Sequence, residues 1–237
     1  MARRMRLTPG RATTWTAVVY HVILSFQDRP ALNNPTAPRL QQAALARFAA
    51  QGFDATSMNE IAADAGIKKP SVYAHFQNKD ELFLSLIPLL IEAELARARA
   101  ALPGGPGLPD QILAYLKSIQ QEFDASPRVR FWLRTLFSPP SHLYDEVMTP
   151  MHLFMDEMEA IFRQAFLTSP FAGAPGALSA DTLARASMSM VDSLQSELLF
   201  GGAEKYAHRL SAIWQVFECA LAAPAAPGAR PVRLGAV

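Results

Sequence analysis

Helical periodicity constrains the fold of this chain more than any other feature of its sequence. From Pro38 onwards apolar residues recur three and four positions apart, and no run alternates with the period of two that a half-buried strand requires. Segments rich in Pro and Gly, such as residues 103–107 and 169–176, separate the periodic runs. Half of the 237 residues are hydrophobic, which is enough to bury a sizeable core. The sequence therefore predicts an all-α protein.

The breaks between the runs place the individual helices. Gly52 is placed to end the first helix, because glycine tolerates the left-handed conformation of a C-terminal cap. Pro88 should kink the fourth helix. The segment 103–107 is glycine-rich, but no Lys-Ser or Lys-Thr follows it, so we interpret it as a linker and not as a phosphate loop. Helices are expected over residues 39–51, 57–65, 68–76, 78–99, 109–125, 127–137, 140–168, 179–200 and 203–223.

Residues 57–76 have the pattern of a helix-turn-helix. Ser57 and Glu60 form a capping box, Gly66 supplies a tight turn, and Pro70 falls in the first turn of the next helix, where a missing N–H costs nothing. In a helix-turn-helix the second helix enters the major groove of DNA. The alternative interpretation is a helical hairpin that only packs within a larger bundle.

The second helix of this pair offers a polar, positively charged outer face. Val72 and Phe76 are its inward-facing apolar positions. Every formal charge from Gly66 to Lys79 is positive, although residues 38–100 as a whole carry seven basic and seven acidic groups. Cations and hydroxyl groups suit both phosphates and base-edge acceptors. The outward side chains are Lys68, Lys69, Ser71, Tyr73 and His75.

The run from Thr56 to Leu82 resembles the N-terminal domain of the tetracycline-repressor (TetR/AcrR) family. The resemblance joins an Ile-Ala pair at 61–62, an Ala-Gly turn at 65–66, Tyr-x-x-Phe at 73–76 and Lys-x-Glu-Leu at 79–82. It covers about 50 residues, and farther on only a Glu-Leu-Leu-Phe-Gly stretch at 197–201 adds to it.

The resemblance implies a homodimeric repressor that releases a palindromic operator on binding a small molecule. It also implies phosphate contacts at Thr56 or Ser57, Tyr73 and Lys79, and a packing role for Ala74 beside Val72 and Phe76. Lys68 stands where the family often has serine, and Pro70 where it often has glycine, so we expect specificity at these two positions. The predicted DNA-binding residues are Thr56, Ser57, Lys68, Lys69, Pro70, Ser71, Tyr73, His75 and Lys79.

Four regions are expected along the chain. Residues 38–83 form the three-helix DNA-binding domain, and residues 84–223 form a helical ligand-sensing and dimerisation domain. Residues 1–37 carry five arginines and one aspartate and are expected to be a disordered extension, as is the tail over 224–237. The run 15–26 imitates the core of a signal peptide, but the small-residue cleavage pattern is missing after it.

Two sets of residues in the second domain are candidates for dimerisation and for ligand binding. Ordinary core packing is the alternative for both sets. The expected dimer interface contains Met188, Val191, Gln195, Leu198, Leu199, Leu210, Trp214 and Phe217. An adaptable lining for a small apolar or aromatic effector is expected from Phe131, Trp132, Tyr144, Met148, Met151, His152 and Met155.

Other classes of protein find little support in the sequence. There is no recognisable catalytic motif, phosphate loop or metal-ligand spacing, so we expect neither an enzyme nor a cofactor or metal. No uncharged apolar run is long enough to span a membrane. Cys219 is the single cysteine; it excludes an intrachain disulfide, fits a reducing cytoplasm, and is expected to be buried. A helical adaptor without DNA binding is the remaining alternative function.

Overall fold

The computed structural model describes residues 36–172 and 177–222, and this part of the chain is helical with no strand. The expected extension lies outside the described residues except for Thr36 and Ala37, which belong to the first described helix and not to the extension. The expected tail over 224–237 and residues 173–176 also lie outside them.

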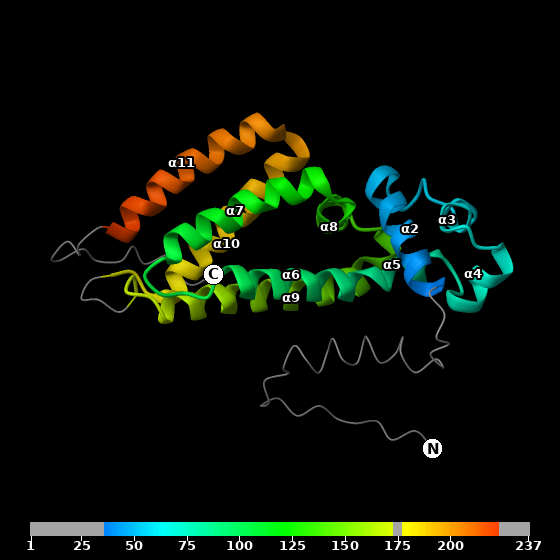
Figure 1. Ribbon diagram of the computed structural model, residues 1–237, viewed down its shortest axis with the longest axis horizontal. Coiled ribbons are helices and arrows are strands. Elements are labelled where there is room, and N and C mark those ends of the chain that lie inside the picture. Colours follow the sequence, from blue (N-terminus) through cyan, green and yellow to red (C-terminus); the bar gives the residue numbers. More distant parts are fainter. Residues whose placement is uncertain (1–35, 173–176, 223–237) are drawn as a thin grey trace, which may run out of the picture.

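The helices follow one another with short connections (Figure 1). They are α2 (Thr36–Gln51), α3 (Met58–Ala65), α4 (Lys69–His75), α5 (Lys79–Leu84), α6 (Leu86–Ala101), α7 (Leu108–Ala125), α8 (Pro127–Phe137), the 3-10 turn η1 (Ser141–Leu143), α9 (Tyr144–Leu167), α10 (Ala180–Phe200) and α11 (Gly202–Ala222).

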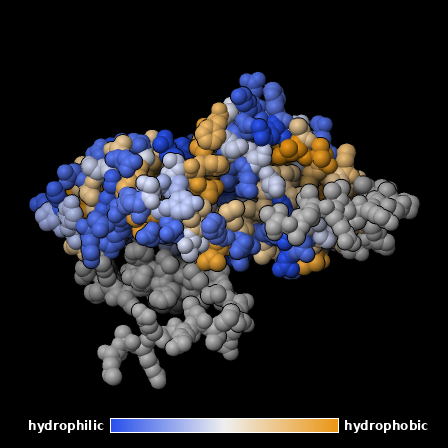
Figure 2. Space-filling view, turned by 180° about the vertical axis from the view of Figure 1, so that it is seen from behind, coloured by the Kyte–Doolittle hydropathy of each residue, from blue (hydrophilic) through white to orange (hydrophobic). Residues whose placement is uncertain are grey.

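Helices α2 to α5 form one end of an elongated molecule, with α3 and α4 at its tip (Figure 1). Helices α6 and α9 run side by side along the body, and α7, α10 and α11 lie together on one side of them. Helix α8 packs against α2 and so joins the two ends. Seen from behind (Figure 2), hydrophilic side chains cover most of the end that carries α3 and α4, and several hydrophobic ones reach the surface of the body.

The fourth expected helix is divided where one kinked helix over 78–99 was predicted. Helix α5 ends at Leu84 and α6 begins at Leu86. Pro88 has no N–H to donate to the carbonyl of Leu84, and its ring crowds that carbonyl, so the break falls one turn before the proline. At the break the Ser85 hydroxyl donates to Leu82 O at 2.7 Å and accepts from Gln41 Nε2 at 3.1 Å.

A cluster of phenylalanines connects the small end of the molecule to its body. The ring of Phe83 on α5 lies with its centroid 5.2 Å from those of Phe48 on α2 and Phe131 on α8. Phe53 packs edge-on against Phe83 at 5.1 Å. Phe131 was predicted to line a ligand site, but it is 1% exposed in this cluster. Aromatic contacts of this kind contribute about 0.5–1.5 kcal/mol each beyond burial of area.

Cys219 is exposed on α11, contrary to the expectation of a buried thiol. The buried side of this helix is formed instead by Tyr206, Leu210, Trp214 and Phe217, whose spacing leaves position 219 on the outer side. Among the described residues no helix is long and apolar enough to cross a membrane.

The Ser57 cap gives a test of the local structure. Its hydroxyl accepts from the Glu60 N–H at 3.3 Å, so we expect Ser57→Ala to lower the free energy of unfolding by about 1 kcal/mol. Urea unfolding followed by circular dichroism measures this. Ser189→Ala on the exposed side of α10 is the control and should change stability by less than about 0.5 kcal/mol. Equal losses in the two variants would contradict the assigned role of the cap.

Candidate functional site

The segment from Ser57 to Phe76 forms the predicted helix-turn-helix. The Ser57 side chain and the Glu60 carboxylate make the reciprocal bonds of the capping box at the start of α3. Gly66 ends α3 with φ of 63°, in the left-handed region that favours glycine, and its N–H donates to Ala63 O at 3.0 Å. Lys68 then caps α4 through its backbone alone, as expected for a residue whose side chain is only a donor.

Helix α4 presents one buried and one exposed side. Val72 and Phe76 are 0% and 6% exposed, so they hold the helix to the rest of the domain as predicted. Tyr73 is 46% exposed and His75 is half-buried. Ala74 was expected to pack, but it is exposed. The fully exposed residues at the start of α4 are Lys68, Lys69, Pro70 and Ser71.

Two arginines of α2 brace α3 and neutralise its acidic groups. Arg47 donates from Nη2 to Asp64 Oδ1 at 2.8 Å, and this hydrogen bond lowers the pKa of Asp64. A hydrogen bond from the Ser57 hydroxyl likewise lowers the pKa of Glu60. Arg39 donates to Ala65 O at 2.6 Å near the end of α3. These contacts fix the angle between α2 and α3.

Lys79 is a structural brace in this fold and not the phosphate anchor predicted from the sequence. Its Nζ donates to Phe53 O at 2.8 Å and to Thr56 O at 2.9 Å, and it lies 4.0 Å from the centroid of the Phe53 ring. Thr56 is also not available as a contact, because it is 2% exposed and its hydroxyl donates to Gly52 O at 2.7 Å. Both side chains instead hold the turn before α3.

The remaining positive charge on this end is concentrated at the start of α4. Lys68 and Lys69 have no hydrogen bond or ion pair within the part of the chain that the structure describes. Arg39, Arg47 and Lys79 carry charge but are committed to internal partners. Of the nine predicted DNA-binding residues, the structure therefore brings Lys68, Lys69, Pro70, Ser71 and Tyr73 together on one exposed face, with Ser57 exposed at the start of α3.

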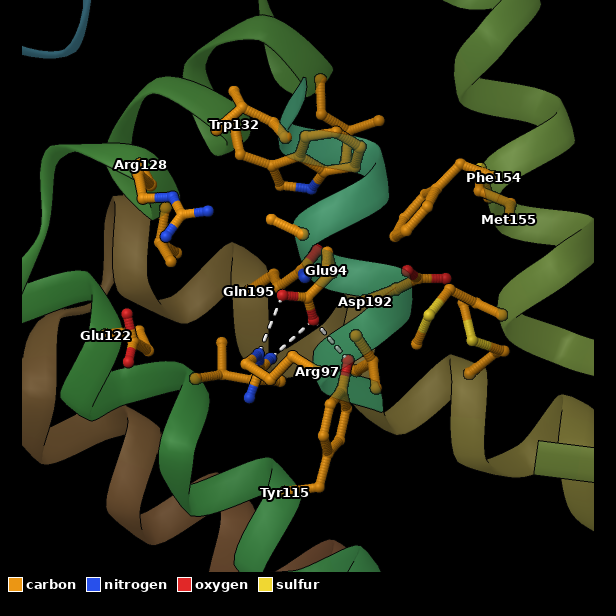
Figure 3. Close-up of a pocket in the computed structure, with 18 residues that line it drawn as sticks. Glu94, Arg97, Tyr115, Glu122, Arg128, Trp132, Phe154, Met155, Asp192 and Gln195 are labelled. Carbon is orange, nitrogen blue, oxygen red and sulfur yellow. Dashed lines mark hydrogen bonds and ion pairs between the residues drawn. The ribbon is translucent and has the colours of Figure 1, made fainter. Parts of the chain in front are cut away.

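A cavity of about 230 Å³ lies in the body of the molecule, between α6, α7, α8, α9 and α10 (Figure 3). Trp132, Phe154, Met155 and Met158 form much of its apolar wall. Five charged side chains also reach it, and the sequence did not single out four of them: Glu94, Arg97, Glu122 and Asp192, which join Arg128.

Only two of the seven predicted ligand-binding residues, Trp132 and Met155, line this cavity. The others are corrected by their positions. Phe131 faces the phenylalanine cluster, Tyr144 is 53% exposed, Met148 is half-buried, Met151 is fully buried in the core, and His152 is exposed. The physical reason is depth along α9, because only the turn from Phe154 to Met158 reaches the cavity.

An internal ion pair occupies one side of the cavity. Arg97 donates from Nε to Glu94 Oε2 at 2.9 Å, and the Tyr115 hydroxyl donates to Glu94 Oε1 at 2.7 Å. The guanidinium of Arg97 also lies 4.5 Å from the centroid of the Tyr115 ring. Burial raises the pKa of the Tyr115 hydroxyl well above its usual value, so it remains a donor to Glu94.

Five of the predicted dimer-interface residues are buried within one chain. Val191, Leu198, Leu210, Trp214 and Phe217 are between 4% and 8% exposed. Met188 and Gln195 line the cavity together with Val191, and Leu199 is half-buried. These helices use their apolar stripes for the intrachain core, which was the alternative interpretation. The outer side of α11 exposes Ala212, Val216 and Cys219, and Val216 is 72% exposed.

Residues 40–86 match the family model described as "Bacterial regulatory proteins, tetR family". The chain carries a TetR-family DNA-binding domain. The match covers α2 to α5, which are the helices that build and brace the exposed face of α4.

Curated relatives agree with this assignment. The chain is 34% identical over 85 residues to the HTH-type transcriptional activator FasR of Mycolicibacterium smegmatis, covering 32% of this chain and 39% of FasR. It is 31% identical over 100 residues to the HTH-type transcriptional repressor SCO4008 of Streptomyces coelicolor, covering 41% and 48%. The chain thus spans less than half the length of these relatives. Both are named as transcriptional regulators and not as enzymes.

Solved structures extend the similarity to the whole fold. E. coli NemR in its reduced form superimposes with a TM-score of 0.61 at 18% identity, covering 80% of this chain and all of that one. TylP, a TetR regulator from Streptomyces fradiae, gives 0.54 at 21% identity and covers 80% and 88%. The all-α architecture, with an N-terminal helix-turn-helix and a C-terminal helical domain, is therefore that of TetR-like proteins.

The brace formed by Lys79 predicts a measurable difference between two lysines. Lys79→Met should lower the free energy of unfolding by about 1–3 kcal/mol, because it removes a charged donor from two backbone carbonyls. Lys69→Met is the matched control and should stay within about 0.5 kcal/mol, since Lys69 is exposed. Urea unfolding of both variants decides the matter, and an unchanged midpoint for Lys79→Met would refute the brace.

Proposed function

We propose that this chain is a homodimeric transcriptional repressor that binds a palindromic operator and releases it when a small molecule enters the cavity. The observation that carries the DNA-binding part is the exposed basic face of α4 at the tip of the molecule. Lys68 and Lys69 have no internal partner, whereas the acidic groups of α3 are neutralised by Arg47. The domain division proposed with it is residues 38–83 for DNA binding and 84–223 for sensing and dimerisation.

The proposed mode of binding follows from the arrangement of α3 and α4. With Val72 and Phe76 buried, the helix can enter a major groove with Lys69, Ser71 and Tyr73 foremost. The first N–H groups of α3 and the hydroxyl of Tyr73 are suited to phosphates on the flanking backbone. Pro70 lies in the first turn of α4, where it removes a backbone donor from the contact face.

Dimerisation is proposed because one helix-turn-helix reads only a few base pairs. Two copies related by a two-fold axis can contact half-sites about 34–36 Å apart. The interface proposed here is the outer side of α10 and α11, with Val216 at its centre, and not the buried stripe first predicted. Ala212, Val216 and Cys219 are spaced so that they share one face of α11.

Ligand release is proposed from the helices that the cavity and the DNA-binding domain share. Helix α8 places Trp132 in the cavity wall and the adjacent Phe131 against Phe48 and Phe83 of the DNA-binding domain. Helix α6 contributes Glu94 and Arg97 to the cavity and continues, through the break at Ser85, from α5. A ligand that prefers one arrangement of α6 and α8 would shift the separation of the two reading heads.

The experiment that tests DNA binding is selection of duplexes from a random pool with the full chain. We expect enrichment of an inverted repeat, which would give the operator, its symmetry and its half-site spacing together. Failure to enrich any sequence, with protein that is folded and dimeric, would favour a helical adaptor that does not bind DNA.

The exposed lysines should contribute through phosphate or base contacts that depend on salt. For the selected duplex, each lost phosphate contact lowers the slope of log affinity against log salt by about 0.9. We expect the double variant Lys68→Met, Lys69→Met to weaken binding and to reduce this slope by up to about 1.8, as measured by fluorescence anisotropy. Lys117→Met on the exposed side of α7 is the control and should leave the slope unchanged.

The outer side of α11 should control the oligomeric state. Val216→Glu places a charge at the centre of the proposed two-fold interface, so we expect a monomer in sedimentation-velocity experiments at micromolar concentration. Ala100→Glu adds the same charge to an exposed position of α6 and should leave the dimer intact. A Val216→Glu variant that remains dimeric would place the interface elsewhere.

A further inference from the structure

One carboxylate at the cavity has no partner in the described part of the chain. Asp192 lies on the cavity side of α10, one turn from Met188 and Gln195. No hydrogen bond or ion pair joins it to any of residues 36–172 and 177–222. Burial raises the pKa of Asp192, and no neighbouring cation opposes this effect. Placing a carboxylate against an apolar wall is costly unless something pairs with it.

The other charges at the cavity do not neutralise Asp192. Arg97 is committed to Glu94 and to the ring of Tyr115. Glu122 and Arg128 have opposite signs, are both exposed, and lie together on the side formed by α7 and α8, away from Asp192 (Figure 3). Three acidic and two basic side chains line the cavity, so the formal charge is −1, and the excess lies at Asp192.

The wall next to Asp192 is suited to a positive charge on an apolar body. Phe154 and Met155 lie beside this carboxylate (Figure 3). Trp132 packs edge-on against Phe154 with ring centroids 4.7 Å apart. Aromatic faces attract cations, and the sulfur atoms of Met155, Met158 and Met188 form a polarisable, adaptable surface.

We propose that the cavity binds an amphipathic organic cation, a substituted ammonium on a small aromatic or branched apolar body, with Asp192 facing the charge. This inference rests on the proposed function only in naming the effector class, because binding to the cavity is measurable without DNA. The apolar or aromatic body matches the wall, and the charge answers the unpaired carboxylate.

The test compares three ligands of similar size by isothermal titration calorimetry on the full chain. Phenyltrimethylammonium and tert-butylbenzene have nearly the same shape and differ in charge, and benzoate supplies a negative charge. We expect the cation to bind about tenfold more tightly than the neutral compound, with benzoate weakest.

Variants of the carboxylate locate the preference. Asp192→Asn keeps the shape and removes the charge, so the cation and the neutral compound should then bind within about twofold of each other. Asp192→Glu keeps the charge and should retain most of the preference. Asp156→Asn, on the exposed side of α9 and outside the cavity lining, is the matched control and should behave as the unaltered protein. Circular dichroism confirms that each variant is folded.

Several outcomes would overturn the proposal. Equal or tighter binding of tert-butylbenzene would make the effector neutral, and tighter binding of benzoate would assign the cavity to Arg128. An unchanged preference in Asp192→Asn, or no binding of any of the three compounds, would remove Asp192 as the recognition group. None of these results bears on duplex selection, and failure to enrich DNA would leave the calorimetric result standing, so the two proposals fail separately.

Discussion

The packing of Phe83 between Phe48 and Phe131 is the contact on which the rest of the structure depends. It brings one side chain each from α5, α2 and α8 together in a buried cluster. The DNA-binding end of the molecule would otherwise be joined to the body mainly through the helix broken at Ser85. With the cluster in place, α8 becomes a wall shared by the two ends, because Phe131 faces one way and Trp132 the other.

Electrostatic pairing then determines which groups remain available for binding. At the tip, Arg47 neutralises Asp64 and Glu60, and Lys79 is committed to the turn before α3, so Lys68 and Lys69 carry the accessible charge. In the cavity, Glu94 and Arg97 satisfy each other, so Asp192 carries the excess. At both sites the groups suited to a ligand are those that the fold leaves without an internal partner. The fold thereby separates a cationic surface for DNA from an acidic cavity for a small molecule.

Local signals made much of this fold predictable from the sequence. The capping box at Ser57, the left-handed Gly66 and the spacing of Val72 and Phe76 are short-range features, so the helix-turn-helix was predicted closely. The roles of Thr56 and Lys79 were not, because they depend on backbone carbonyls brought together only in three dimensions. Helical spacing identified the apolar stripes of α10 and α11 but could not distinguish an intrachain core from a dimer interface. Asp192 carried a signal that was not used, a single acid within the stripe of Met188, Val191 and Gln195.

The central claim is that α4 is the surface that binds DNA. Hydrogen–deuterium exchange of the full chain, with and without a duplex obtained by selection, tests it most directly. The account predicts that the duplex slows amide exchange in residues 66–76 and at the start of α3, since these segments would be covered or ordered by the nucleic acid. Protection confined to the body of the molecule, with α4 exchanging as in the free protein, would contradict it.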